Sequence, residues 1–198
     1  MGAPEDTAAG DAPSTVHDTP PEVVLQAKLH EDPNDVATFT ALVELIRQRA
    51  AQGHGGIAPS HPRDSSIWAL AEEIAQDQRA WYPLIELARL SIDEDRDAAI
   101  RRLGVAAERD PTGQALLEGL LLLRSAGMPE AALGLGVGHW RPRRHPLEAG
   151  RQLVEAALDA GRVGEARRHL RAMAAHPDAD QTILDDIQAL VTVAEQVR

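Results

Sequence analysis

The stretches LLLRSAGMPEAA (residues 121–132) and AALDAGRVGEA (residues 156–166) decide the fold, because they repeat one pattern at a fixed interval. In each, an apolar run ends at a glycine and a small residue follows five positions later. The equivalent residues lie 34 positions apart: Gly127 and Gly161, then Ala132 and Ala166. A glycine between two helix-forming runs is typical of a helix end. The pattern therefore predicts a repeated unit of two helices joined by a tight turn.

The rest of the chain also favours helices. Hydrophobic residues make up 43% of the chain but aromatic residues only 3%, so Leu and Ala must form most of the core, and both are good helix formers. Apolar periodicity interrupted by Gly and Pro predicts helices at about 21–31, from 36, from 65, at 81–90, and at 97–109, 114–126, 129–137, 147–160, 164–175 and 181–197. The short connections favour antiparallel neighbours.

Two segments lack helical periodicity. Residues 1–20 form an acidic tail rich in Pro and Ala, which we expect to be disordered, although it could instead be an acidic arm that binds a partner. Residues 53–64 contain several Gly and Pro and predict a loop inserted into the helical domain, which spans 21–198.

The sequence resembles the tetratricopeptide-repeat superfamily. The turn glycines and the small residues that follow them match its pattern, and Trp81, Leu84, Ala88, Ala99, Leu103, Ala106 and Pro111 suit an earlier unit. The resemblance covers about residues 21–177 and is strongest for 81–177. The unit at Trp81 lacks a turn glycine, and Gly119 and Gly136 replace larger residues. The resemblance implies an all-α fold in which antiparallel helix pairs stack as a short right-handed solenoid.

In this family the first helices of the pairs line a concave face that binds peptides. The resemblance implies that this face carries Glu44, Arg47, Tyr82, Glu86, Arg89, Leu117, Arg124 and Arg151. The guanidinium groups of the arginines would bind carboxylates of the partner there, and Tyr82 and Leu117 would contact its apolar side chains. The alternative is that Glu followed by Arg three positions later is a solvated pair that only supports its helix.

A second candidate site is the sequence HWRPRRH at residues 139–145. It places three arginines, two histidines and a tryptophan together in an acidic chain: His139, Trp140, Arg141, Arg143, Arg144 and His145. These side chains could bind a phosphate, an acidic peptide or RNA by charge and stacking. Alternatively, Trp140 packs over the end of the preceding helix, and the cations favour the negative end of its dipole.

The composition argues against several other functions. The net charge is −11, and residues 1–36 hold eight acids and one base, so nucleic-acid binding is an unlikely main role. Without cysteine there is no thiolate chemistry. No run is long enough for a membrane helix and no signal peptide is evident, so we expect a cytoplasmic protein.

No enzyme motif is present either, and we expect neither catalysis nor a cofactor or bound metal. The sequence Gly134-x-Gly136-x-Gly138 follows a helix rather than the strand that a dinucleotide site requires. The leading hypothesis is a non-enzymatic adaptor that binds a peptide or protein partner on its concave face. The alternatives are polyanion or nucleic-acid binding through the 139–145 loop, and an accessory or regulatory subunit of an enzyme complex.

Overall fold

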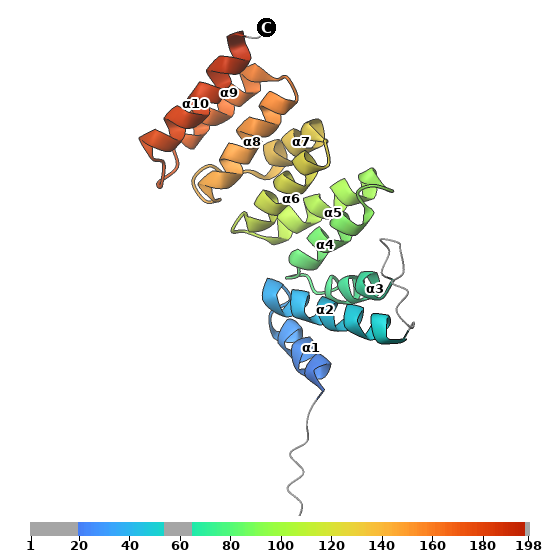
Figure 1. The fold of residues 1–198 in the computed structure, drawn as a ribbon. Helices are drawn as coiled ribbons and strands as arrows, with labels where there is room; N and C mark the ends of the chain where they lie inside the picture. The colour runs from blue at the N-terminus through green and yellow to red at the C-terminus, as the bar shows by residue number, and fades with distance from the viewer. Residues whose placement is uncertain (1–19, 54–64, 197–198) are drawn as a thin grey trace, which may run out of the picture.

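A computed structural model of the chain describes residues 20–53 and 65–196, and this part is built from helices (Figure 1). In chain order they are α1 (Pro21–Glu31), α2 (Val36–Gly53), α3 (Ser65–Ile74), α4 (Tyr82–Ser91), α5 (Arg96–Arg109), α6 (Gln114–Ser125), α7 (Pro129–His139), α8 (Leu147–Asp159), α9 (Val163–Met173) and α10 (Gln181–Gln196). The described residues contain no strand, which confirms the all-helical prediction. Most of the predicted 53–64 loop and of the N-terminal tail lies outside the described residues.

The helix ends differ from the sequence prediction in two instructive places. Trp81 precedes α4, so Pro83 lies in the first turn, where its missing N–H removes no helical hydrogen bond. The predicted helix end at Gly138 is wrong, because α7 continues to His139. In the described chain only Gly113, Gly127 and Gly161 adopt a positive φ, so Gly138 keeps a backbone compatible with the helix.

The two turn glycines that define the repeat end their helices in the same way. Gly127 has φ 68° and Gly161 has φ 70°, in the left-handed region that favours glycine. The N–H of the following residue bonds back to Leu123 O at 2.9 Å in one turn and to Ala157 O at 2.7 Å in the other. Both turns are therefore Schellman motifs, which end a helix and redirect the chain for an antiparallel partner.

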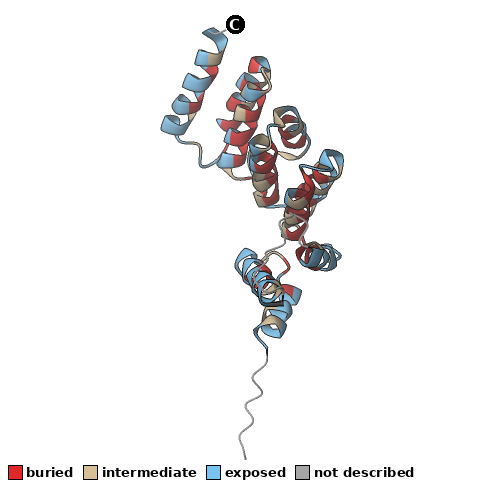
Figure 2. Ribbon diagram, turned by 45° about the vertical axis from the view of Figure 1, so that its right-hand side comes forward, coloured by how far each residue is buried: buried red, intermediate tan, exposed pale blue. Residues whose placement is uncertain are grey.

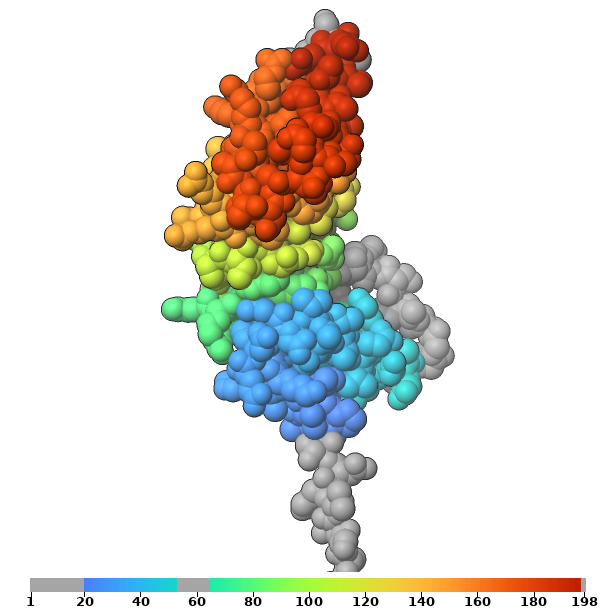
Figure 3. All heavy atoms as spheres, turned by 90° about the vertical axis from the view of Figure 1, so that its left-hand side faces the viewer, coloured from blue at the N-terminus to red at the C-terminus, as the bar shows by residue number. Residues whose placement is uncertain are grey.

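The helices pack in pairs. Helix α4 packs on α5, α6 on α7, and α8 on α9. Successive pairs are joined on one side by contacts of α4 with α6, α6 with α8, and α8 with α10, and on the other side by α5 with α7. The elements follow one another along the long axis in chain order, from α1 at one end to α10 at the other (Figures 1 and 3).

The core is made of leucine and alanine, as the composition predicts. Ala99, Ala132 and Ala166, the small residues of the repeat, have no exposed surface, and neither do Leu103, Leu116, Leu120, Leu123 and Leu153. Buried residues gather where neighbouring helices face each other (Figure 2). Each buried leucine contributes about 1.5–3 kcal/mol relative to an exposed one.

Two glycines inside helices allow neighbours to approach closely. A methyl group at Gly119 of α6 would lie 2.9 Å from Leu135 Cδ2 of α7. A methyl group at Gly136 of α7 would overlap Leu153 of α8, with Leu153 Cγ at 3.2 Å and one methyl carbon closer still. Large neighbouring side chains therefore fill the space that a side chain at either glycine would need.

The first helix pair is attached to the rest by Asn34, which lies between α1 and α2. Its Oδ1 accepts hydrogen bonds from the N–H groups of Trp81 at 2.7 Å and Tyr82 at 3.0 Å, and its Nδ2 donates to Arg79 O at 2.9 Å. The N-terminal cap of α2 is therefore Asp35, whose carboxylate accepts from the Thr38 N–H at 3.1 Å.

Candidate functional site

The helices α4, α6 and α8 lie side by side and present a common surface, which we call the α4–α6–α8 face. It carries Tyr82, Glu86 and Arg89 from α4, Leu117, Leu121 and Arg124 from α6, and Arg151 and Glu155 from α8, all at least partly exposed. Six of the eight predicted partner-binding residues therefore belong to this face: Tyr82, Glu86, Arg89, Leu117, Arg124 and Arg151.

The other two predicted residues, Glu44 and Arg47, lie on α2. Both are exposed, and Glu44 accepts a hydrogen bond from Gln48 on the same helix at 3.2 Å. Helix α2 packs mainly on α1, and it reaches α4 through an edge-to-face contact of the Phe39 and Tyr82 rings. Glu44 and Arg47 lie beyond this contact along α2, so the structure does not place them in the row formed by α4, α6 and α8.

An ion-pair network links α6 to α8 across the face. Arg124 Nη1 lies 2.6 Å from Glu155 Oε2, Arg124 Nε lies 2.9 Å from Asp159 Oδ2, and Arg124 also donates to Gln152. Glu155 accepts a second bond from Arg151 Nε at 2.9 Å. Both guanidinium groups therefore already bind carboxylates of the chain: Arg124 fixes α6 against α8, and Arg151 holds Glu155 within α8.

Arg89 and Tyr82 are also engaged with neighbouring groups. Arg89 Nε lies 3.4 Å from Glu86 Oε1, three residues earlier on α4. Tyr82 packs edge-to-face against both Phe39 and Trp81. Burial, and then the negative charge of Glu86, raise the pKa of the Tyr82 hydroxyl to about 12. The prediction that arginines here bind a partner's carboxylates would require these internal pairs to open.

The apolar centre of the face is larger than the sequence suggested. Leu121 is 41% exposed, and it lies one helical turn after Leu117, which is partly buried. Sequence reasoning missed Leu121 because it belongs to the run Leu120–Leu123, which looks like continuous core. The four-residue spacing from Leu117 was the available signal, since residues so spaced share a helix face.

The 139–145 loop is firmly held. Trp140 packs on α8, where a methyl group at Gly150 would lie 2.5 Å from its Cζ2, and its ring meets His169 of α9 edge-to-face at 6.1 Å. Its indole N–H is buried, with no hydrogen-bond partner in the described chain. The indole is thus half-buried and fixed in place by α8 and α9.

The two histidines of the loop have structural partners. His145 is buried, its Nδ1 accepts a hydrogen bond from the Arg141 N–H at 3.3 Å, and its carbonyl oxygen lies 3.0 Å from His176 Nε2. Burial, with a contribution from nearby Arg141, lowers the pKa of His145. His139 Nδ1 lies 3.0 Å from Leu135 O, so its ring caps the end of α7.

The three arginines of the loop differ from those of the α4–α6–α8 face. Arg141, Arg143 and Arg144 are exposed, and none forms an ion pair with an acid among residues 20–53 and 65–196. With Trp140, Ala172 and Ala175 they line a shallow groove of about 490 Å³. On the α4–α6–α8 face the arginines are paired with acids, so the arginines without an ion pair among the described residues lie in the 139–145 loop.

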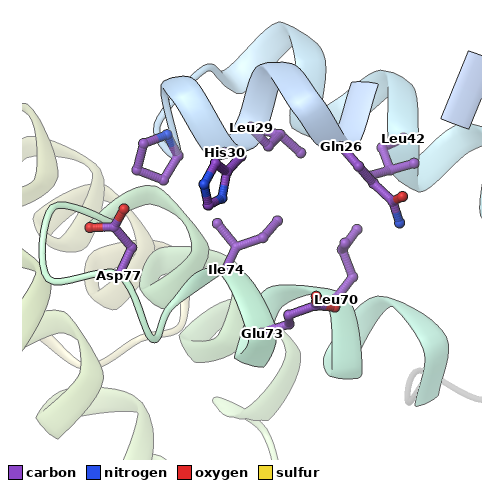
Figure 4. A pocket seen from close by; sticks show the side chains of 9 residues that line it. Gln26, Leu29, His30, Leu42, Leu70, Glu73, Ile74 and Asp77 are labelled. Carbon is purple, nitrogen blue, oxygen red and sulfur yellow. The ribbon is translucent and has the colours of Figure 1, made fainter. Parts of the chain in front are cut away.

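A further cavity of about 430 Å³ lies between α1, α2 and α3 (Figure 4). Leu29, Leu42, Leu70 and Ile74 form its apolar walls, and His30, Glu73 and Asp77 contribute polar groups. The Asp77 carboxylate is bound by Arg79 at 2.7 Å. The cavity belongs to the junction of the first helix pair with the rest, away from α6 and α8.

The described residues give two further findings about possible functions. Within them, no group of three or more His, Asp or Glu side chains is placed to hold a metal ion. Among the same residues, every helix is too short or too polar to cross a membrane.

Comparisons with known proteins add no relative. No family model, curated protein or solved structure matches the chain. The resemblance to tetratricopeptide repeats therefore remains a prediction from the sequence.

Proposed function

We propose that the chain is a cytoplasmic, non-enzymatic interaction module of the tetratricopeptide-repeat type, which binds a peptide or protein partner on the α4–α6–α8 face. The observation that carries the proposal is the pair of exposed Leu121 and half-buried Leu117 on α6, the middle one of three adjacent helices. Contacts between alternate helices, α4 with α6 and α6 with α8, support a solenoid in which this face is the concave one.

The chemistry of the face suits a partner with apolar anchors. Leu121 is 41% exposed, so burying its remaining surface against a partner would contribute about 0.6–1.2 kcal/mol, a proportionate share of the value for a whole leucine side chain. The network of Arg124, Glu155 and Arg151 holds α6 and α8 in fixed positions, so little ordering would be needed on binding. We therefore assign the arginines to a preformed frame and the leucines to the contact itself.

The test is affinity capture from cell extract with wild type and two matched variants. Leu121→Glu changes the proposed face, and Val105→Glu changes an equally exposed apolar residue on α5, where Val105 is 39% exposed and Leu121 is 41% exposed. A partner should be captured by wild type and by Val105→Glu. Leu121→Glu should bind it about tenfold more weakly or worse, because the leucine contact is lost and a carboxylate would be buried in its place.

The comparison of the two variants can also reject the proposal. Equal capture by the two variants, with helicity unchanged by circular dichroism, would reject the face as the binding surface. Leu121 is a sharper site for this test than Arg124, because replacing Arg124 also leaves Glu155 and Asp159 without their ion-pair partner.

A further inference from the structure

The groove beside the 139–145 loop has a floor and a rim of different chemistry. Trp140, Ala172 and Ala175 provide apolar surface, which we call the floor, and Arg141, Arg143 and Arg144, which we call the rim, line the same groove. The loop connects α7 to α8, and the two alanines lie at and just beyond the end of α9. Apolar surface beside three cations fits a ligand that carries both carboxylates and an apolar side chain.

The state of the arginines points to an anionic ligand. Some surface arginines lie beside acids, as Arg151 does with Glu155 and Arg162 with Glu165, whereas others, such as Arg96 and Arg101, stand singly without an ion pair among the described residues. The 139–145 loop differs in gathering three such arginines within four residues. The chain carries 31 acidic residues against 20 basic ones, and yet the described chain supplies no ion-pair partner to the three rim arginines. Three unpaired guanidinium groups within four residues concentrate positive charge that a carboxylate-bearing ligand would neutralise.

The loop is also preformed. Trp140 is locked against Gly150 and His169, and buried His145 packs on Gly113, where no methyl group could fit. His176 of the α9–α10 connection holds the His145 carbonyl oxygen at 3.0 Å. A ligand would therefore meet arginines on a backbone that is already ordered, which reduces the entropic cost of binding.

The surroundings favour a polypeptide over a nucleic acid. The Trp140 indole is half-buried and held by contacts with Gly150 of α8 and His169 of α9, so a base cannot stack on it as freely as on an exposed aromatic side chain. Glu108 and Asp110 line a neighbouring hollow together with Arg141 and Arg144. A continuous phosphate backbone would pass close to these carboxylates, whereas a short acidic segment can place its charges on the arginines alone.

We infer that this groove binds an acidic segment of a partner polypeptide. Its carboxylates pair with Arg141, Arg143 and Arg144, and an apolar side chain between them rests on Ala172, Ala175 and the edge of Trp140. This contact is separate from the α4–α6–α8 face and does not depend on it.

The test uses the full chain and fluorescence anisotropy with three labelled probes: a short peptide of alternating Glu and Leu, the same peptide with Gln in place of Glu, and an oligothymidylate. The Glu peptide should bind most tightly, and its affinity should fall between about 50 and 200 mM salt. Replacing Arg141, Arg143 and Arg144 by Ala should weaken it about tenfold or more, because three ion pairs are lost.

Further variants distinguish an effect at the groove from a general effect of net charge or of folding on peptide binding. A control variant has Ala in place of Arg96, Arg101 and Arg162, so it loses the same charge from other exposed sites. Its affinity for the Glu peptide should stay within about twofold of wild type. Ala175→Glu places a carboxylate in the floor at an exposed position and should weaken the Glu peptide as strongly as the rim variant. Leu121→Glu should leave it unchanged.

Three results would overturn the inference. Equal binding of the Glu and Gln peptides would remove the role of charge. Equal losses in the rim variant and the matched arginine variant would remove the role of the groove. Tighter binding of the oligothymidylate, lost in the rim variant, would assign the groove to nucleic acid instead.

Discussion

The close approach of α7 and α8 at Gly136 can be tested with two alanine substitutions in one helix. A methyl group at Gly136 must displace Leu153, which has no exposed surface and whose Cγ and second methyl carbon would lie at 3.2 and 3.3 Å. A methyl group at Gly134, two residues earlier and on the exposed side of α7, meets no atom within 4 Å. The two substitutions change the helix propensity equally but differ in packing.

The expected magnitudes follow from these two environments. Gly134→Ala should stabilise the protein by about 0.5–1 kcal/mol, because alanine loses less backbone entropy than glycine in a helix. Gly136→Ala gains the same amount, but overpacking against Leu153 costs about 1–3 kcal/mol. Gly136→Ala should therefore be about 1–3 kcal/mol less stable than Gly134→Ala.

Urea unfolding followed by circular dichroism measures this difference, with similar m-values expected for both variants. Adding Leu153→Ala to each tests the mechanism. The cost of Leu153→Ala should be smaller in the Gly136→Ala background, because the added methyl group then occupies part of the vacated space. Equal stability of the two glycine variants would refute the close approach of α7 and α8.

Three further predictions concern buried polar and titratable groups. Tyr82 is the only tyrosine, so the phenolate absorbance of the folded chain reports on this residue alone. The absorbance should titrate with a pKa of about 12, because burial and then the charge of Glu86 disfavour the phenolate. A midpoint near the ordinary value of about 10 would contradict this. Burial lowers the pKa values of His145 and His169 below 6.5. The free energy of unfolding should therefore be highest above pH 6.5 and should fall as the pH drops below that value. Equal midpoints of urea unfolding at about pH 8 and about pH 5.5 would argue against this effect. Asn34→Ala should lower the free energy of unfolding in urea by about 1–3 kcal/mol, because the N–H groups of Trp81 and Tyr82 lose their acceptor. Asn34→Asp keeps an acceptor oxygen and should lower it less. An equal loss in the two variants would be inconsistent with the role given to Asn34.

The sequence predicted the parts of the fold that depend on local chemistry. Gly127 and Gly161 could be assigned to turns because a left-handed residue after a helix strongly favours glycine. Ala132 and Ala166 could be recognised as equivalent small residues of the repeat because the same spacing recurred, and both are fully buried. Gly138 misled the prediction because a glycine near a helix end can also remain helical.

The candidate sites were harder to predict because their state depends on distant residues. Arg124 looked like a free cation, and its partners Glu155 and Asp159 come from the next helix pair, 31 and 35 positions later. Nothing local distinguishes it from Arg141, which has no such partner. Likewise, the role of Asn34 depends on the backbone of residues 79–82, which its own neighbourhood does not reveal.

The central claim, that the α4–α6–α8 face is the partner surface, is tested most directly by hydroxyl-radical footprinting of the chain with and without its captured partner. The rate of side-chain oxidation should fall at Leu121 and Tyr82 in the complex. It should stay unchanged at Val105 and Val137, which are exposed on α5 and α7. Protection of Val105 and Val137 with no change at Leu121 and Tyr82 would contradict the claim.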